Sequence, residues 1–388
     1  MVAHLIRPRN WNKLAGTGIQ FMHCYSQPLC TPSRVQIMTG QYNFRNYTGW
    51  GTLDLHQRTF GDVMKKGGYA TCLSGKWQLK GDLNAPQKAG FDEYCFWNIG
   101  SGFAAIKGSR YANPTIYQNG KKLKNLENKY GPDVFCEFAT RFITKHRNDP
   151  FFVYYPMVLP HRPFRPTPDS LINSENTGAS ERSSNQNFAD MVAYVDKIVG
   201  CIVDKLDTLG IRENTLILFT TDNGTHEQIV SKLGKVSIRG GKGQTTDAGT
   251  RVPLIANWKG HTPEGMISND LVDFTDFLPT VAELGDIPLS TVIPIDGVSF
   301  FPQLLGKQEN PREWVFCSFN PKKSGYSNKE IRFARDQRWK LYDSGQLFDI
   351  KNDPLESHPV SKNNQTPKAT SARQKLQKAL ASYQHVEY

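Results

Sequence analysis

The sequence predicts an α/β fold, with a sheet sandwiched by helices and a smaller antiparallel subdomain at the C-terminal end. Apolar segments with strand character alternate with amphipathic segments of helical period over most of the 388 residues, which is the pattern of a helix-covered sheet. Polar signatures follow directly after the strand segments, as at the carboxyl edge of a parallel or mostly parallel sheet. After about residue 306 the pattern changes to short strands. We therefore predict a main domain over 1–306 and a subdomain over 307–388.

The elements of the main domain are predicted in chain order from apolar periodicity and from glycines that end helices. The first are a helix running into a strand at 10–22, a helix at 35–39 that Gly40 ends, an amphipathic helix at 58–67 and a buried strand at 69–74. Residues 101–131 are rich in Gly, Asn and Lys and are expected to form a surface excursion. A helix at 134–147, a strand at 151–157, a polar loop at 170–187, a helix at 189–209 and strands at 215–220 and 254–258 follow.

The predicted subdomain combines short strands with one helix. Four short runs alternate in the way that antiparallel strands do, at 314–319, 331–335, 339–342 and 346–349, and a basic helix is expected at 367–384.

The charge composition of the chain favours some classes of binding partner over others. The net charge of +11 and the pI near 9.2 favour anionic partners. A block of Lys and Arg or a recognition-helix pattern would indicate nucleic acid, and the sequence contains neither, so we expect no nucleic-acid partner; a sulfated glycan is an equally natural anion. The seven cysteines are scattered without a Cys-x-x-Cys pair, which indicates neither a zinc module nor a disulfide scaffold.

Targeting segments are not expected from this sequence. No run of 18 apolar residues is present, so no membrane span is predicted. The first seven residues are too short an apolar run, and end in charge too soon, to form a signal peptide.

The most informative motif is Cys-x-Pro-x-Arg, from Cys30 to Arg34. With seven cysteines and ordinary usage of Pro and Arg, chance would produce roughly 0.02 such matches in this chain. The alternative interpretation is a half-buried cysteine beside a turn-forming proline.

Two further motifs bring cationic or titrating side chains to strand ends. Lys76 lies in Gly-Lys-Trp-Gln-Leu, directly after a predicted strand, where an ammonium group can pair with anionic oxygens. His161 lies between prolines after the strand at 151–157. An imidazole titrates near neutrality and suits proton transfer, and the prolines restrict the loop that carries it. The alternatives are an ordinary surface lysine and a structural histidine.

Asp222 and Asn223 follow the strand at 215–220. A carboxylate and an amide oxygen are ligands for Ca²⁺ or Mg²⁺, although Asp-Asn-Gly is also a common turn. Lys242 opens a glycine-rich segment that continues to Arg251. That segment lacks the strand–GxxxxGK[ST]–helix pattern of a phosphate-binding loop.

These five segments, in this order, resemble the type I (formylglycine-dependent) sulfatases, and the resemblance implies an alkaline-phosphatase-like mixed sheet. It implies that a formylglycine-generating maturation enzyme oxidises Cys30, and that the product acts as nucleophile and as a metal ligand together with Asp222 and Asn223. Calcium is the implied metal, with magnesium possible. The substrate-binding residues implied are Lys76, Gln78, His161 and Lys242, of which His161 protonates the leaving group and Gln78 stands where the family usually has histidine. Arg34 is implied to brace the nucleophile, whereas Arg251 is expected to be structural.

One part of the family pattern is missing. The sulfatases begin with a strand that ends in two adjacent aspartates, whereas the first acidic residue here is Asp54. The resemblance therefore implies that a central strand and two metal carboxylates are absent, which predicts weak metal binding and little activity. A truncated or misassigned start is the expected reason, and it would also remove the signal peptide of a full-length form that is periplasmic or secreted.

Three functions remain open at this point. The first is hydrolysis of an aryl or carbohydrate sulfate. The second is hydrolysis of a phosphodiester or phosphonate monoester, which some members of the same superfamily carry out with formylglycine. The third is a non-catalytic protein that binds anions or glycans.

Overall fold

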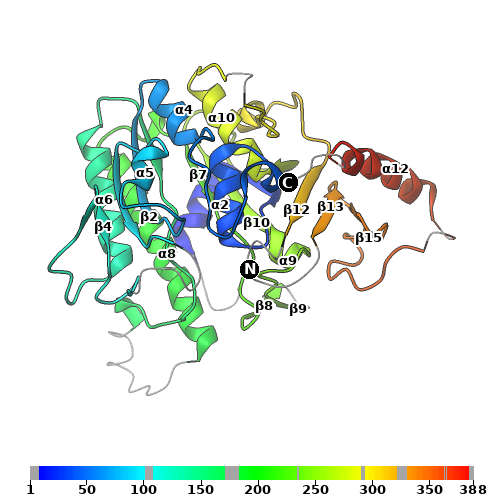
Figure 1. The fold of residues 1–388 in the computed structure, drawn as a ribbon, viewed down its shortest axis with the longest axis horizontal. Coiled ribbons are helices and arrows are strands. Elements are labelled where there is room, and N and C mark those ends of the chain that lie inside the picture. The colour runs from blue at the N-terminus through cyan, green and yellow to red at the C-terminus, as the bar shows by residue number, and fades with distance from the viewer. Residues whose placement is uncertain are drawn as a thin grey trace.

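The computed structural model describes residues 8–100, 108–170, 183–233, 236–289, 293–320, 330–361, 363 and 365–383. Its central layer contains two sheets (Figure 1). The first has the order β11-β1-β10-β7, with β1 at Ile19–Tyr25, β7 at Ile217–Thr220, β10 at Arg251–Asn257 and β11 at Met266–Asp273. The second has the order β5-β4-β3-β2-β6, with β2 at Ala70–Lys76, β3 at Glu93–Trp97, β4 at Tyr117–Gln118, β5 at Lys121–Lys122 and β6 at Phe151–Tyr154.

Strand directions are mixed in both sheets. β1 runs parallel to β11 but antiparallel to β10, and β10 runs antiparallel to β7. β2 runs parallel to β3 and to β6, while β4 runs antiparallel to β3. The mixed sheet is confirmed, but the narrower expectation of a mostly parallel one is wrong for the first sheet. An apolar run such as that of β10 indicates a buried strand and carries no information about its direction.

Helices cover both faces of this layer. On one face α1 (Arg9–Gly16) contacts β10 and α8 (Ser184–Thr208), and α6 (Gly131–Lys145) contacts β2 and α8. On the other face α4 (Phe60–Lys66) contacts β2, α2 (Cys30–Thr39) and α10 (Phe277–Leu284). Side chains from both sheets belong to one continuous core, as Phe21 and Leu73 show. The two sheets are therefore parts of one sandwiched layer.

Local chemistry explains where several helices begin and end. α2 ends at Gly40, whose φ of +67° is left-handed and therefore suits glycine. α4 begins with a capping box between Thr59 and Asp62, and α8 with one between Ser183 and Gln186; in each, side chains satisfy the first backbone N–H groups. The smaller elements are α3 (Asn43–Asn46), α5 (Ala85–Lys88), α9 (Asp247–Thr250), α11 (Phe301–Leu304), the hairpin β8–β9 (Val230–Leu233 and Val236–Arg239) and the 3₁₀ turns η2 (Arg212–Asn214) and η3 (Phe274–Asp276).

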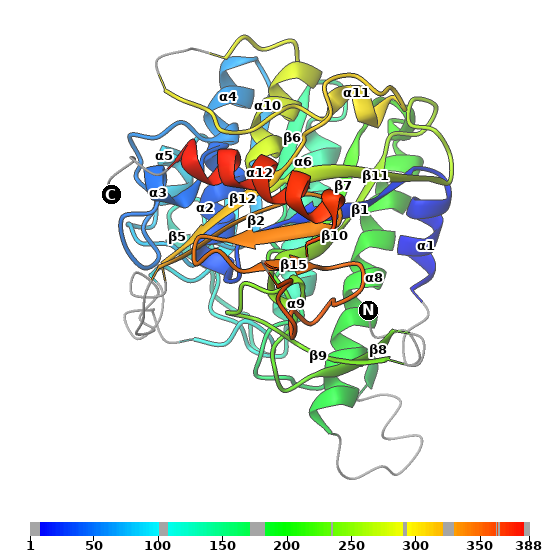
Figure 2. The same cartoon turned by 90° about the vertical axis from the view of Figure 1, so that its right-hand side faces the viewer.

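The C-terminal part forms an antiparallel sheet beside the main layer, drawn orange and red in Figure 1 and facing the viewer in Figure 2. Its strands β12 (Val315–Phe319), β13 (Ile331–Arg335), β14 (Trp339–Tyr342) and β15 (Leu347–Asp349) are packed under α12 (Pro367–Ala381). Its core also includes Tyr42 and Phe44 of the first part. The division at residue 306 stays a prediction, since the two parts share core side chains.

Some expectations need correction. Residues 184–187 of the expected loop belong to α8, because the capping box starts the helix before its apolar stripe begins; residues 171–182 lie outside the described part. The expected surface excursion at 101–131 buries Tyr111, Ile116 and Tyr130, although 101–107 also lie outside the described residues. β3, β11 and α10 were not anticipated. In the described residues no helix is long and apolar enough to cross a membrane.

Candidate active site

Cys30 is the first residue of α2 and is only 6% exposed. Within the described part of the chain no side chain caps this end of the helix, so its unpaired N–H groups and its dipole favour negative charge there. Burial raises the pKa of the Cys30 thiol, but the ammonium groups of Lys76 and Lys242 lower it by more, and the resulting pKa is about 7 instead of 9.0. The position is therefore built to stabilise an anion.

Arg34, one helical turn further along α2, holds the end of β2. Its guanidinium donates hydrogen bonds to the backbone carbonyls of Trp77, of Gln78 at 3.3 Å and of Lys76 at 3.4 Å. The backbone packs closely here, because a Cβ on Gly75 would lie 2.2 Å from the Pro156 carbonyl, and Gly75 has a φ of +125°. Arg34 therefore braces the segment that carries Lys76.

Lys76 and Asp222 meet at the carboxyl ends of β2 and β7. The ammonium nitrogen lies 3.5 Å from Asp222 Oδ2, and the side chains are 4% and 36% exposed. Burial lowers the pKa of Lys76, while Cys30 and Asp222 raise it in part. Burial raises the pKa of Asp222, but Lys76 and Lys242 more than offset this and the net pKa is lowered. Asp222 is thus ionised at neutral pH.

His161 follows β6 in a loop with cis peptide bonds before Pro160 and Pro163. Its Nδ1 lies 2.7 Å from the Arg162 carbonyl, a contact that places the proton on Nδ1 and leaves Nε2 as an acceptor. The hydroxyl of Tyr111 bonds the backbone N–H and carbonyl of His161. Burial, then Lys242, Lys76 and Arg110, lower the pKa of His161 well below 6.5. The imidazole is therefore neutral in the ligand-free site.

Lys242 lies on a loop that two backbone contacts place beside the amino end of α2. Its N–H donates to the Thr225 carbonyl at 3.0 Å, and the N–H of Gly243 donates to the Pro28 carbonyl at 2.9 Å. The loop needs glycine, since a Cβ on Gly241 would lie 2.7 Å from the Cβ of Ala248.

The C-terminal sheet anchors this Lys242 loop. Asp247 forms a buried ion pair with Arg335, and the ammonium of Lys340 donates to the Thr245 carbonyl. Arg251 donates from Nε to the Met22 carbonyl at 2.9 Å, in keeping with the structural role expected for it. Asp247 therefore acts in placing the loop.

The cation ligands expected at Asp222 and Asn223 form only part of a metal site. Asn223 donates its amide N–H to the Gly224 carbonyl at 2.8 Å, and among the described residues its buried Oδ1 has no hydrogen-bond partner, as expected of a ligand oxygen. However, the described residues include no group of three or more His, Cys, Asp and Glu side chains that could hold a metal. Calcium takes six to eight oxygen ligands. The donors present therefore do not complete a calcium site.

Two further polar residues, Gln78 and His226, lie close to these segments of the chain. Gln78 has a left-handed φ of +44°, and its Oε1 is buried without a hydrogen-bond partner in the described part. His226 packs edge-on against Phe164 and accepts a hydrogen bond at Nδ1 from the N–H of Gln228. Gln78 thus offers an unsatisfied oxygen, whereas His226 is engaged elsewhere.

Arg110 was missed in the sequence. Its guanidinium lies 3.9 Å above the ring of Trp97, its Nη1 is buried without a hydrogen-bond partner, and it forms no ion pair with a carboxylate within the described residues. Its positive charge interacts with Cys30, which raises the pKa of Arg110, and lowers the pKa of His161. The segment around it has no periodicity, so no sequence signal indicated a half-buried cation. A desolvated guanidinium without a counter-ion is costly and indicates a place for an anion.

Together these residues bring cationic side chains to the carboxyl edge of an α/β sheet, beside the amino end of a helix. Comparisons with known proteins identify the family of the chain. A family model described as Sulfatase matches residues 4–287, and one described as N-sulphoglucosamine sulphohydrolase, C-terminal, matches residues 242–385. The chain belongs to the sulfatase family, and its fold is the alkaline-phosphatase-like one.

The chain is similar to several individual proteins. It is 30% identical to human arylsulfatase A over 79% of this chain and 64% of that protein, and 30% identical to the arylsulfatase of Hemicentrotus pulcherrimus over 89% and 66%. The structure of BT4656 in complex with its substrate D-glucosamine-2-N,6-O-disulfate is similar, with a TM-score of 0.79, 22% identity and coverage of 98% of this chain and 94% of that one. The chain thus spans slightly less than two thirds of the length of these two arylsulfatases.

Proposed function

We propose that the matured protein is an arylsulfatase-like sulfuric-ester hydrolase that cleaves an aryl or carbohydrate sulfate. One observation carries this proposal. Residue 30 is buried at the N-terminus of α2, and the positive charges of Lys76 and Lys242 lower the pKa of its side chain. A sulfate ester bound there would have its charge neutralised by preorganised cations, which is the main source of catalysis in such sites. Family membership supports the reaction class.

Each residue has a role that follows from its surroundings. Formylglycine made from Cys30 would supply a hydrated aldehyde, whose hydroxyl is an oxygen nucleophile. Lys76 and Lys242 offset the charge that spreads over the sulfate oxygens, and Arg34 keeps the end of β2 in place through its bonds to the carbonyls there.

His161 is the proposed proton donor to the leaving oxygen. Its imidazole is neutral in the free site, so it must gain a proton before it can act as an acid. An anionic sulfate beside it favours the charged imidazolium and raises its pKa. Nδ1 stays bonded to the Arg162 carbonyl, which leaves Nε2 to take and deliver that proton.

The ligands for a metal ion are incomplete in this site. Asp222 and the Asn223 Oδ1 would bind Ca²⁺ or Mg²⁺, but they provide one carboxylate where a high-affinity site needs several. No step of the mechanism is therefore assigned to a metal. We expect weak cation binding and little turnover from these residues alone.

The proposed substrates are sulfated small molecules or glycans, to which the charge of +11 is suited. A formylglycine-generating enzyme is the proposed maturation partner. The proposed location is the periplasm or the outside of the cell.

The test is expression with a formylglycine-generating enzyme, mass spectrometry of the peptide that contains residue 30, and parallel assays with nitrophenyl sulfate and bis-nitrophenyl phosphate. We expect conversion of Cys30 and release of sulfate in excess of phosphate ester cleavage. The Cys30→Ala variant is the control and should be inactive. Equal activity of that variant, or a preference for the phosphate ester, would contradict the proposal.

A second candidate is a sulfated-glycan-binding protein without turnover, which the incomplete metal site favours. Equilibrium binding of a sulfated oligosaccharide separates the two. Binding that depends on Lys76 and Lys242, together with an unmodified Cys30 after co-expression with the maturation enzyme, would support this second function.

A further inference from the structure

A second group of polar side chains lies at the end of β3, next to the strand that carries Lys76. Trp97, the last residue of β3, is in register with Lys76 at the end of β2. The Arg110 guanidinium lies 3.9 Å above the ring of Trp97, whose Nε1 donates to the Gly108 carbonyl at 3.3 Å. Stacking and hydrogen bonding therefore attach the segment that carries Arg110 to the strand beside Lys76.

The backbone after Arg110 is held equally firmly. The N–H of Gly131 donates to the Tyr111 carbonyl at 2.9 Å. The Tyr111 hydroxyl donates to the Val158 carbonyl and accepts from the backbone N–H of His161, both at 3.2 Å. Arg110 is thus held between the end of β3 and the loop of His161. A ligand that binds a side chain on such a preorganised segment loses little affinity to the ordering of the protein.

The charge of Arg110 has no carboxylate partner among the described residues. Its Nη1 is buried there without a hydrogen-bond partner, although the side chain as a whole is only half-buried. The groups that favour its charged form are Tyr111 and Cys30, and neither of them is a carboxylate. Stacking on an aromatic ring offsets only part of the cost of desolvating a guanidinium. An anionic group on a ligand would offset the rest.

Asn98, the residue after Trp97, offers a hydrogen-bond acceptor at the same strand end. It is 3% exposed, and within the described part of the chain its Oδ1 is buried without a partner. Its carbonyl accepts from the N–H of Gln78 at 2.8 Å, and its φ of +74° is one that asparagine tolerates. A neutral amide oxygen binds hydroxyl or N–H groups and does not attract an anion. Asn98 and Arg110 together therefore suit a ligand that has both a hydroxyl and an anionic group.

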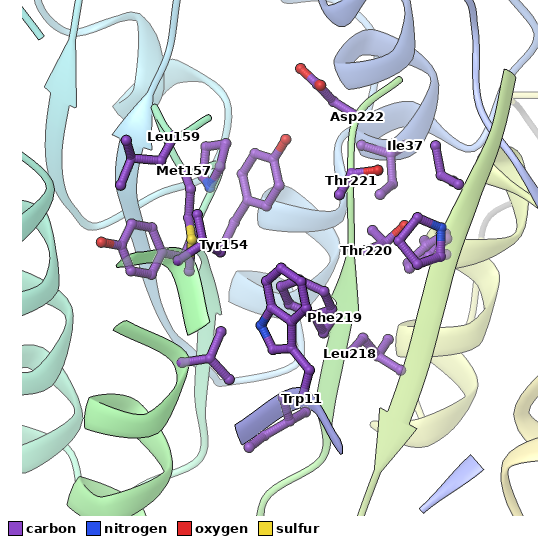
Figure 3. Close-up of a pocket in the computed structure, with 18 of the residues that line it drawn as sticks. Trp11, Ile37, Tyr154, Met157, Leu159, Leu218, Phe219, Thr220, Thr221 and Asp222 are labelled. Atoms are coloured by element: carbon purple, nitrogen blue, oxygen red, sulfur yellow. The ribbon is translucent and has the colours of Figure 1, made fainter. Parts of the chain in front are cut away.

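These residues are separate from the pocket drawn in Figure 3. Leu159 lies across that pocket from Asp222, and neither Asn98 nor Arg110 lines it. Arg110 is reached from the surface instead, because residues 108–109 beside it are exposed. Arg110 also interacts electrostatically with Cys30, so the group that it binds and a sulfate beside Cys30 can belong to one ligand.

We propose that Arg110 and Asn98 form a second subsite, which selects a sulfated sugar that carries a further anionic group and a free hydroxyl. Arg110 binds the second anion through its forked N–H groups, and the Asn98 Oδ1 accepts from the hydroxyl. A second sulfate and a uronic carboxylate both fit this fork. The inference rests on the proposed function, in which Lys76 and Lys242 hold the sulfate that is cleaved. It narrows the substrate to a sugar with at least two anionic groups.

The experiment measures binding by calorimetry to the whole chain carrying Cys30→Ser, which cannot be matured and so does not consume the ligand. The probes are inorganic sulfate, N-acetylglucosamine 6-sulfate, glucosamine 2-N,6-O-disulfate, and a disaccharide of N-acetylglucosamine 6-sulfate with glucuronic acid. We expect the disulfated sugar or the disaccharide to bind about tenfold more tightly than the monosulfated sugar. The tighter of the two identifies the second anion as sulfate or carboxylate.

Variants made in the same chain assign the preference to its residues. Arg110→Gln should abolish the preference and leave the affinity for the monosulfated sugar nearly unchanged. Arg141→Gln removes the same charge from an exposed position on α6 and should keep the preference. Arg110→Lys retains the charge without the fork, should keep part of the preference, and replaces Arg110→Gln if that variant fails to fold by circular dichroism. Asn98→Gly, which accommodates the left-handed φ, should weaken binding of all three sugars and leave that of inorganic sulfate unchanged.

Modification with phenylglyoxal, which reacts with arginine, locates the second anion. The tighter ligand should slow modification of the peptide that contains Arg110, and the monosulfated sugar should not. Equal affinities for the three sugars, or an equal loss of preference in Arg141→Gln, would overturn the inference. The sulfate site would still stand in that case if Lys76→Met weakened binding of inorganic sulfate. If neither sulfate nor any of the sugars bound, the proposed function would fail and the inference with it.

Discussion

Replacing Lys76 should make the thiol of Cys30 markedly less acidic. The pKa of that thiol is about 7, because Lys76 and Lys242 outweigh the effect of burial. A unit charge within about 10 Å contributes at least ~1.7 kcal/mol at an effective dielectric constant near 20, a little over one pKa unit. Lys76→Met should therefore raise the pKa of Cys30 to about 8 or above, and the thiolate fraction at pH 7 should fall from about half to about a tenth.

The assay is alkylation of unmatured protein with iodoacetamide between pH 5 and 10, followed by quantitation of the peptide containing Cys30. Only the thiolate reacts, so the rate at pH 7 should drop roughly fivefold in Lys76→Met. The exposed Cys201 provides an internal reference, and Lys80→Met, at an exposed lysine after the same strand, is the matched control. An unchanged midpoint in Lys76→Met, or an equal shift in Lys80→Met, would refute the electrostatic explanation.

Four more predictions follow from contacts of the site. Asp247→Asn leaves Arg335 buried and unpaired and should lower the free energy of unfolding by about 3–5 kcal/mol, as urea titration would show; Asp247→Asn combined with Arg335→Met should recover part of the loss. Binding of a sulfated ligand near pH 7 should take up a proton, because the pKa of His161 starts well below 6.5 and rises beside an anion; calorimetry in buffers of different ionisation enthalpy measures this uptake, and His161→Gln should remove it. Arg110→Gln should weaken binding of a disulfated sugar more than that of its monosulfated analogue, by roughly tenfold; equal losses for both ligands would contradict a role in reading a second anion. Gly75→Ala should destabilise the fold by several kcal/mol, because its Cβ meets the Pro156 carbonyl at 2.2 Å; an unchanged melting temperature would show that the close approach is not required.

Elements with strong local signals could be predicted from the sequence. The end of α2 at Gly40, most of the long helix α8 and the apolar runs of β6 and β7 appear where periodicity and glycine placed them, although α2 begins at Cys30 and α8 at Ser184, each five residues before the expected start. β11 alternates too little to stand out, and β3 is short. The antiparallel direction of β10 depends on which strand it meets in space. Such pairing is a tertiary property that no local window contains.

The sequence could predict which side chains lie at strand ends. Lys76 ends β2, while His161 and Asp222 follow β6 and β7, and the topology brings these ends together with Cys30; their role in a site stays a prediction. Arg110 was not predictable, because only its stacking on Trp97 and the lack of a counter-ion among the described residues distinguish it from the other surface-like cations around it. The neutral state of His161 was also hidden, since it depends on cations from distant segments.

The attachment of the Lys242 loop to the C-terminal sheet has a consequence for how this protein can vary. Lys340 is fully buried, pairs with Glu356 and donates to the Thr245 carbonyl, three residues from Lys242. An exchange of the C-terminal region between homologues would therefore move Lys242, the proposed substrate-binding lysine, unless the partners of Lys340 and Arg335 were exchanged with it. Chimeras that join related chains before residue 242 should keep these contacts together, whereas junctions placed after residue 306 should separate them.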